Sequence, residues 1–165
     1  MQVSTGNSRL VKFFVAAAIF FAWGIIQGAL QAQKPIHDFI SLGPANIIVG
    51  THAHIGLLGW VALALWGTIY HLLPQLGKPI AWPKLVDWIF WIFVIFLALN
   101  SIIMITVGIR AGNAFNSGVK GPQLDALMQP YMMTIGILSI ILAIVGLLFV
   151  IQILVSAARK APVKS

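Results

Sequence analysis

Two histidines separated by a single residue, His52 and His54, are the residues of this chain best suited to bind a metal centre. They lie in the run GTHAHIGLLGWVALALWGTIYHLLPQL, residues 50–76, which holds three of the four histidines of the sequence. On a regular α-helix, two residues at this spacing point about 200° apart. The two imidazoles therefore cannot bind one small metal ion together, but each can meet a different ligand on its own side of the helix.

Three glycines share the helix face of His52. By the same geometry, Gly56, Gly59 and Gly67 fall within about 60° of it, which makes a smooth stripe against which a flat group can lie. A histidine at the end of such a groove suits a haem, because the imidazole supplies the axial ligand and the groove admits the macrocycle. Two other interpretations stay open. Glycines also serve close helix packing, and a buried histidine can be a hydrogen-bonded packing residue.

The composition indicates that these residues lie in a membrane. The chain has 165 residues, of which 60% are apolar and 8% charged, and its mean hydropathy is +0.99. Globular domains carry about 25% charged residues, so this much apolar surface needs lipid as its solvent. The absence of cysteine excludes disulfides, iron–sulfur clusters, thiolate zinc sites and C-x-x-C-H haem attachment. The absence of glutamate, with only three aspartates, excludes paired-carboxylate catalysis.

Four apolar stretches are long enough to cross a hydrocarbon core, which takes about 20 residues. We expect transmembrane helices at about 10–31, 48–73, 85–109 and 131–156, in one all-α domain over residues 1–165. The first stretch is longer than the apolar core of a signal peptide, about 7–15 residues. We therefore expect it to be a helix of the mature protein.

The basic residues predict the orientation of the helices. Lysine and arginine accumulate on the cytoplasmic side, and seven of the ten lie at the N-terminus, in the second loop or in the C-terminal tail. We therefore expect a multi-pass protein of a bacterial-type inner membrane, with both termini in the cytoplasm and the histidine pair in the outer half. Because the basic residues are scattered between apolar spans, the expected partner is the lipid bilayer and not nucleic acid. The seven are Arg9, Lys12, Lys78, Lys84, Arg159, Lys160 and Lys164, and the other three are Lys34, Arg110 and Lys120.

The two segments expected on the outer side differ in length. The first, KPIHDFISLGPAN, contains His37 and can form a short interfacial helix. The second, IRAGNAFNSGVKGPQLDALMQP at residues 109–130, is long and rich in glycine and asparagine. Such a segment suits a loop that caps a site.

The run THAHIGLLGWVALALWGTIYHLLPQL resembles the tenth helix of the catalytic subunit of haem-copper oxidases, the superfamily that includes nitric-oxide reductases. In that helix a His-x-His pair holds two haems on opposite faces. The resemblance implies that His52 corresponds to the ligand of the high-spin haem and His54 to that of the low-spin haem. Gly67 falls in the family's glycine pattern, and His71 and Pro74 fall on its terminal histidine and proline. The family helix also runs from the outside to the inside.

The next helix extends the resemblance, and the rest of the chain departs from it. Its end, GIRAG, places Arg110 where family arginines contact haem propionates, and an ordinary interfacial arginine is the other interpretation. The family subunit usually has twelve helices, and nothing in this chain matches its copper or non-haem-iron ligands. We therefore expect no copper and no binuclear centre.

The family fold suggests how four helices can suffice. Its twelve helices form three four-helix arcs around a pseudo-threefold axis, and this chain is similar to one arc. The resemblance therefore predicts a homo-oligomer, with a trimer favoured, in which the second helices lie inside. Each subunit interface then holds one haem b (protohaem IX), bound by His52 of one subunit and His54 of the next.

These expectations favour a membrane b-type haem protein that transfers single electrons, with a quinone or another redox protein as a candidate partner. Enzymatic activity stays open and is the less favoured interpretation. One alternative is a five-coordinate haem that binds oxygen or nitric oxide; another is a non-redox accessory or assembly subunit whose histidines serve packing or copper handling. His71, about 25 Å from His54 along a regular helix, belongs to a different place. Asn100, deep in the third helix, is expected to bond across helices or to reach a cofactor.

Overall fold

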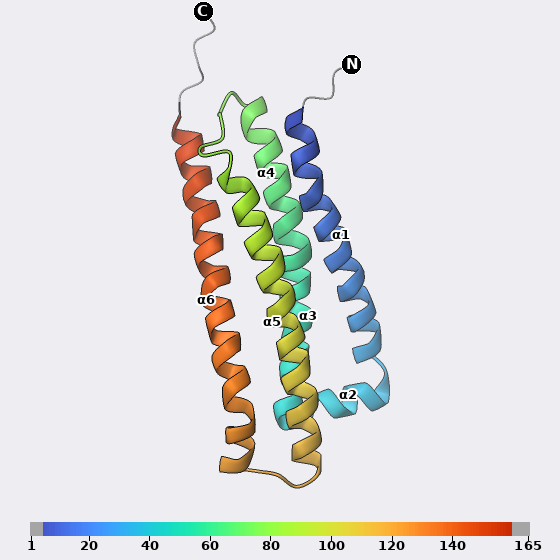
Figure 1. Cartoon of the computed structure of the whole chain (residues 1–165). Helices are drawn as coiled ribbons and strands as arrows, with labels where there is room; N and C mark the ends of the chain where they lie inside the picture. Colours follow the sequence, from blue (N-terminus) through green and yellow to red (C-terminus); the bar gives the residue numbers. More distant parts are fainter. Residues whose placement is uncertain (1–4, 160–165) are drawn as a thin grey trace, which may run out of the picture.

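The protein is a bundle of long helices, seen in a computed structural model that describes residues 5–159, with side chains from Arg9 onward (Figure 1). All regular structure in that range is helical. Within it, four stretches are long and apolar enough to cross a membrane: Arg9–Gln31, Gly43–Gln75, Leu85–Asn116 and Pro122–Ala158. They confirm the predicted all-α fold with four spans. Lys160 and Lys164, counted above for the orientation, lie outside the described residues.

The helices run alternately up and down, so that the beginning of α1 and the end of α6 lie at the same end of the bundle (Figure 1). The short helix α2 crosses the opposite end. In chain order the elements are α1 (Thr5–Gln31), α2 (Lys34–Ile40), η1 (Gly43–Asn46), α3 (Ile47–His54), η2 (Ile55–Ala62), α4 (Leu63–Gln75), α5 (Leu85–Asn116) and α6 (Pro122–Ala158).

The second membrane stretch is not one regular α-helix. It begins as a 3₁₀ turn, η1, continues as α3 up to His54, becomes a π-helix, η2, and ends as α4. The π-helix, with its wider i→i+5 hydrogen-bonded turns, begins directly after His54. The expectation of a regular α-helix therefore holds for the histidine pair but is wrong beyond it. Regular helix geometry cannot be used to compare the directions of His52 and Gly67, because the π-helix lies between them.

The short helix expected in the first loop is confirmed. It is α2, with proline in its first turn, and Lys34 pairs with Asp38 one turn later at 2.7 Å. His37 is exposed on it.

The long loop expected at 109–130 is wrong. Helix α5 continues to Asn116 and α6 begins at Pro122, which leaves residues 117–121 as the turn. Gly118 and Gly121 adopt φ angles of 91° and 57° there, a backbone conformation that glycine enters without steric cost. Proline in turn favours the first positions of a helix. Both helices are therefore longer than the roughly 20 residues that a hydrocarbon core needs.

Helix α1 packs tightly along the second stretch because two glycines leave room for phenylalanine rings. A Cβ atom added to Gly59 would lie 2.5 Å from Cγ of Phe20, and one added to Gly67 would lie 2.8 Å from Cβ of Phe13. Both phenylalanines are almost completely buried. Small residues that let helices approach closely are typical of membrane bundles, so these two contacts set the distance between the helices.

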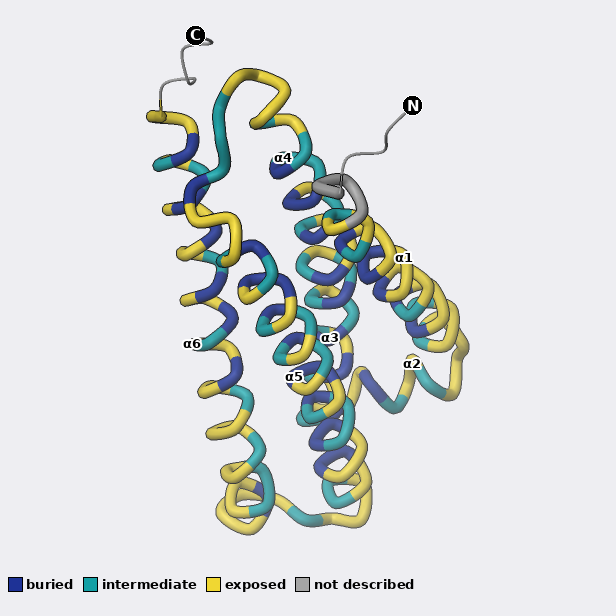
Figure 2. The backbone as a smooth tube through the Cα atoms, turned by 45° about the horizontal axis from the view of Figure 1, so that its top comes forward, coloured by how far each residue is buried: buried dark blue, intermediate teal, exposed yellow. Residues whose placement is uncertain are grey.

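The other side of the second stretch packs through aromatic rings. The indole of Trp66 stacks on Phe149 of α6 at 4.4 Å between ring centroids and contacts Phe93 of α5 at 4.5 Å. The buried residues line the inner faces of the helices, and exposed residues face outward (Figure 2). A single core therefore joins α1, the second stretch, α5 and α6.

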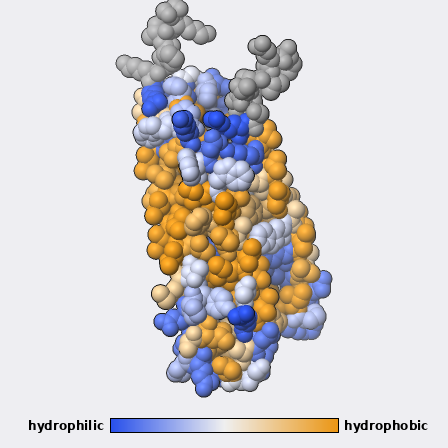
Figure 3. All heavy atoms as spheres, viewed as in Figure 1, coloured by the Kyte–Doolittle hydropathy of each residue, from blue (hydrophilic) through white to orange (hydrophobic). Residues whose placement is uncertain are grey.

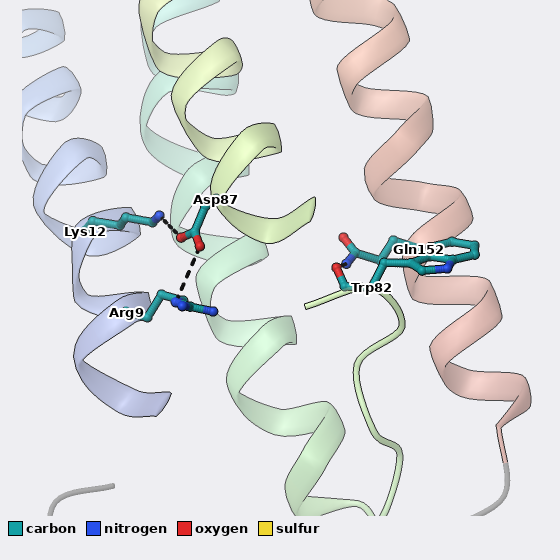
Figure 4. A network of polar contacts seen from close by, with 5 residues as sticks. All are labelled: Arg9, Lys12, Trp82, Asp87 and Gln152. Atoms are coloured by element: carbon teal, nitrogen blue, oxygen red, sulfur yellow. Dashed lines mark hydrogen bonds and ion pairs between the residues drawn. The ribbon is translucent and has the colours of Figure 1, made fainter. Parts of the chain in front are cut away.

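Polar side chains join the helices near the end where the termini lie. Asp87 in the first turn of α5 pairs with Lys12 and, at 3.4 Å, with Arg9, both from α1 (Figure 4). The carboxylate at this helix N-terminus also complements the helix dipole. The ion pairs therefore hold α1 beside the beginning of α5.

A buried glutamine fixes the connection between α4 and α5. Gln152 of α6 donates to the carbonyl oxygens of Ala81 at 2.6 Å and Trp82 at 3.1 Å, and its own oxygen accepts from the hydroxyl of Tyr70 at 2.7 Å. Figure 4 shows it beside Trp82. Backbone groups without water need such partners, so one side chain attaches this loop to α6.

The outer surface carries an apolar belt. On the face drawn in Figure 3, hydrophobic residues cover the middle of the bundle and hydrophilic residues gather towards its two ends. Ile19 and Leu147 are among the large apolar side chains that the structure leaves exposed. An apolar surface of this extent needs lipid around it, so the protein is a multi-pass membrane protein.

We predict that Gly59→Ala destabilises the bundle by about 1–3 kcal/mol, because the new methyl group overlaps Phe20. Reversible unfolding in mixed detergent micelles measures this loss. Gly136→Ala is the matched control, since nothing lies within 4 Å of its added Cβ and it gains the same helix propensity. Equal stability of the two variants would contradict the packing described here.

Candidate functional site

The two histidines of α3 line separate grooves on opposite sides of the second stretch. His52 belongs to a groove of about 320 Å³ between α1 and the second stretch. His54 belongs to a groove of about 300 Å³ formed with α5 and α6. The side chains therefore diverge as the sequence predicts. The first groove is lined by Phe21, Gly24, Ile25, Gly28, Ala29, His52, Gly56 and Trp60, and the second by His54, Leu58, Trp66, Phe93, Ser139, Leu142, Ala143 and Gly146.

His54 has its ring held by the backbone. Its Nδ1 lies 2.8 Å from the carbonyl oxygen of Gly50, one turn earlier. A carbonyl oxygen only accepts hydrogen bonds, so Nδ1 must carry the proton and donate it. The neutral ring then keeps its lone pair on Nε2, which is the tautomer that a metal ligand needs. The bond to Gly50 therefore holds the ring of His54 in the tautomer whose Nε2 can accept.

His52 is held by packing alone. Its Nδ1 is buried and has no hydrogen-bond partner in the protein. The edge of its ring lies against Gly28 of α1, where an added Cβ would be 3.0 Å from Cε1. Sequence reasoning missed Gly28, although Gly24 and Gly28 form a small-xxx-small pattern that marks close helix approach.

The three glycines assigned to the face of His52 have different surroundings. Gly56 lines the groove, and nothing lies within 4 Å of its added Cβ. Phenylalanine rings of α1 cover Gly59 and Gly67. Within one chain, the open space beside His52 therefore extends to Gly56 and not along the whole stripe.

Arg110 and His71 lie apart from the two grooves. The guanidinium of Arg110 donates to the hydroxyl of Tyr131 on α6 and also lies over its ring, 5.8 Å from the centroid. His71 shares a 2.7 Å contact with Gln75 near the end of α4. Neither residue lines the grooves of His52 and His54. A role of Arg110 towards haem propionates stays a prediction.

Asn100 is fully buried in α5 and only partly bonded. Its Nδ2 lies 3.7 Å from the sulfur of Met104, and its Oδ1 has no partner. Met104 also approaches Gly50, where an added Cβ would be 3.3 Å from Cε. Helices α3 and α5 are antiparallel (Figure 1). His54, four residues after Gly50, and Asn100, four residues before Met104, are therefore displaced in the same direction from the contact between Gly50 and Met104. The two residues are therefore at a similar depth.

The donor set fits a haem better than a bare metal ion. Within residues 5–159 no group of three or more His, Cys, Asp or Glu side chains is placed to hold a metal ion. A haem supplies four nitrogens of its own and needs only axial ligands from the protein. The fixed tautomer of His54 offers one such ligand in its groove, and the open side of Gly56 leaves space beside His52 in the other groove.

Comparison with known proteins identifies the family. The family model described as Cytochrome C and Quinol oxidase polypeptide I matches residues 2–145. The chain belongs to this family. It is a membrane protein similar to subunit I of haem-copper oxidases, so the resemblance stated from the histidine run is confirmed.

The relatives of this subunit I family are much longer than the chain. A cytochrome c oxidase subunit 1 homolog of Azorhizobium caulinodans is 28% identical over 105 residues, covering 62% of this chain and 18% of the relative. Cytochrome c oxidase subunit 1 of Rhodobacter capsulatus is 28% identical over 105 residues, covering 62% and 19%. The Cbb3-type subunit CcoN1 of Stutzerimonas stutzeri is 29% identical over 69 residues, covering 42% and 14%. The chain thus spans less than a fifth of these relatives. No solved structure matches it significantly.

We predict that His54 is the Nδ1–H tautomer in the protein without haem. The bond to Gly50 selects that form, so the ¹⁵N NMR spectrum of histidine-labelled protein in micelles should show one protonated Nδ1 and one unprotonated Nε2 for this ring. His54→Ala assigns the signal. A protonated Nε2 on His54 would contradict the geometry.

Proposed function

We propose that this protein binds haem b in the membrane through His52 and His54 and transfers single electrons. The observation that carries the proposal is the hydrogen bond from Nδ1 of His54 to Gly50, which leaves Nε2 free in a residue that lines a groove. Membership of the subunit I family supports it, because the histidine run matches the family's haem-binding helix. Electron donors and acceptors of the proposed kind are a quinone or another redox protein.

A second copy of the chain completes the proposed site. Each groove is about 300 Å³ and is formed by one chain, which is room for only part of a macrocycle. The two grooves lie on opposite sides of the second stretch, so in a closed ring of chains the groove of His52 faces the groove of His54 of the next copy. A trimer would reproduce the three arcs of the family fold, with one haem at each interface.

The residues of the chain have separate tasks in this arrangement. His54 offers a lone pair whose direction is set by the Gly50 carbonyl. Phe21 and Trp60, with ring centroids 3.9 Å apart, form an apolar wall beside His52 and exclude water. His52 and His54 would hold the haem, which would supply one-electron chemistry. No copper is required.

The proposed orientation places both termini in the cytoplasm of a bacterial inner membrane. Most of the basic residues that the structure describes gather with the termini, among them Arg9 and Lys12 on α1 and Lys84 before α5. The proposed orientation follows the tendency of basic residues to lie on the cytoplasmic side, and the relatives named above are bacterial.

A gas-binding haem is the second candidate function. It is favoured by one observation: Nδ1 of His52 is buried without a partner. A ligand without that support is weaker, so a haem bound mainly by His54 could accept oxygen or nitric oxide on its other side.

We predict that protein expressed with ample haem shows a sharp reduced α-band and about one haem per chain in a pyridine haemochrome assay. His54→Ala should remove most of the haem or make it high-spin, and His52→Ala should do the same, because each change deletes an axial ligand. His37→Ala is the control, since His37 is exposed on α2. A colourless wild-type protein would rule out the proposal.

We predict that chains carrying His52→Ala and chains carrying His54→Ala restore low-spin haem when they are co-expressed. In a ring, a His54→Ala chain still offers His52 and its neighbour still offers His54, so random mixing rebuilds roughly a quarter of the interfaces. Absorption spectra and native mass spectrometry of the mixed oligomers measure this. If both ligands came from one chain, mixing would restore nothing.

A further inference from the structure

The two histidines differ in the carbonyl available to them. His54 donates to the carbonyl oxygen of Gly50, the residue four positions earlier. The equivalent carbonyl for His52 is that of Ile48, which is also four positions earlier on α3. Nδ1 of His52 makes no such bond, although it is buried. Both histidines therefore have a carbonyl four residues earlier on α3, and only His54 donates to it.

The carbonyl oxygen of Ile48 is occupied by α1. Nε2 of Gln27 donates to it at 3.2 Å, and Nε2 of Gln31 donates to it at 3.3 Å. Within α3 the same oxygen also accepts the backbone N–H of His52, four residues later. A carbonyl oxygen has two lone pairs, so with three donors it has no acceptor capacity left for the ring of His52.

Stability does not explain Gln27. The residue is only 8% exposed, and its Oε1 is buried without a hydrogen-bond partner. An unpaired buried oxygen destabilises the fold, whereas an apolar side chain of the same shape can be neutral or better. We therefore look for the role of Gln27 in its hydrogen bond to the carbonyl oxygen of Ile48.

We propose that Gln27 and Gln31 are positioning residues that make His52 the exchangeable one of the two proposed haem ligands. By occupying the carbonyl of Ile48, they deny His52 the second hydrogen bond that His54 has. The effect on the haem ligand rests on the function proposed above, whereas the competition for the carbonyl oxygen of Ile48 does not. The small uncharged ligand that takes the place of His52 is a diatomic molecule such as carbon monoxide.

The chemistry follows from the missing bond. A ligating histidine that donates its second N–H is oriented and made more basic by the acceptor. His54 has this support, and His52 has only its contact with Gly28. Carbon monoxide would take the place of Nε2 of His52 as a neutral two-electron donor, so the exchange would change no oxidation state. The apolar walls of Phe21 and Trp60 favour an uncharged entering ligand.

The first experiment tests the competition for the carbonyl without haem. In Gln27→Met/Gln31→Met, similar apolar side chains release the oxygen of Ile48, and Nδ1 of His52 can donate to it. We expect the ¹⁵N spectrum of labelled histidine to move His52 towards the Nδ1–H tautomer, while His54 stays unchanged as an internal reference. If the double variant folds poorly, the single variants Gln27→Met and Gln31→Met, each of which removes one of the competing donors, should show the same shift of His52 in part. Unchanged His52 signals in the folded variants would overturn the inference.

The second experiment measures the consequence in the haem-loaded protein. We expect the reduced double variant to bind carbon monoxide roughly tenfold more weakly than the wild type and to have a lower midpoint potential, because His52 is then the stronger ligand. Gln33→Met is the control, since the side chain of Gln33 makes no capping bond at α2. Equal carbon monoxide affinity of wild type and double variant would overturn the inference and leave haem binding intact. A wild type without haem would instead refute the proposed function, and the tautomer experiment would still decide the competition.

Discussion

The structure depends on the scarcity of hydrogen-bond partners in hydrocarbon. Without water, backbone groups must be satisfied within helices, and each polar side chain must find an acceptor in the protein or remain unpaired. Several side chains solve this by donating to the carbonyl one turn earlier, as Thr68 does to Ala64 and His54 does to Gly50. At the carbonyl oxygen of Ile48 several donors compete for one acceptor, and Gln27 and Gln31 of α1 donate to it.

The position of α1 decides which side chains compete there. Gly59 and Gly67 let Phe20 and Phe13 sit against the backbone of the second stretch, and Asp87 pairs with the beginning of α1 at the other end of the bundle. These contacts bring Gln27 to the carbonyl of Ile48. The packing of apolar rings and the bonding of buried amides are therefore parts of one arrangement.

The chain matches only a small part of the length of its relatives. It belongs to the subunit I family yet spans less than a fifth of the relatives it matches. Its two grooves are open on opposite sides of one helical stretch. A longer subunit can close such grooves with further helices of its own chain, and we propose that here neighbouring copies close them.

Local patterns in the sequence determined the spans, the short helix α2 and the divergence of His52 from His54. Each depends on residues within a few turns of one another: on apolar length for the spans and on helical geometry for the histidines. Only the tertiary structure decided that Gly59 and Gly67 are covered while Gly56 is open, and that Ile48 bonds to a glutamine 21 positions away. The π-helix after His54 and the continuation of α5 through Arg110 also became apparent only in the structure. The physical reason is that these features depend on which side chains α1, α5 and α6 bring to the second stretch, and helical periodicity within one segment carries no information about that.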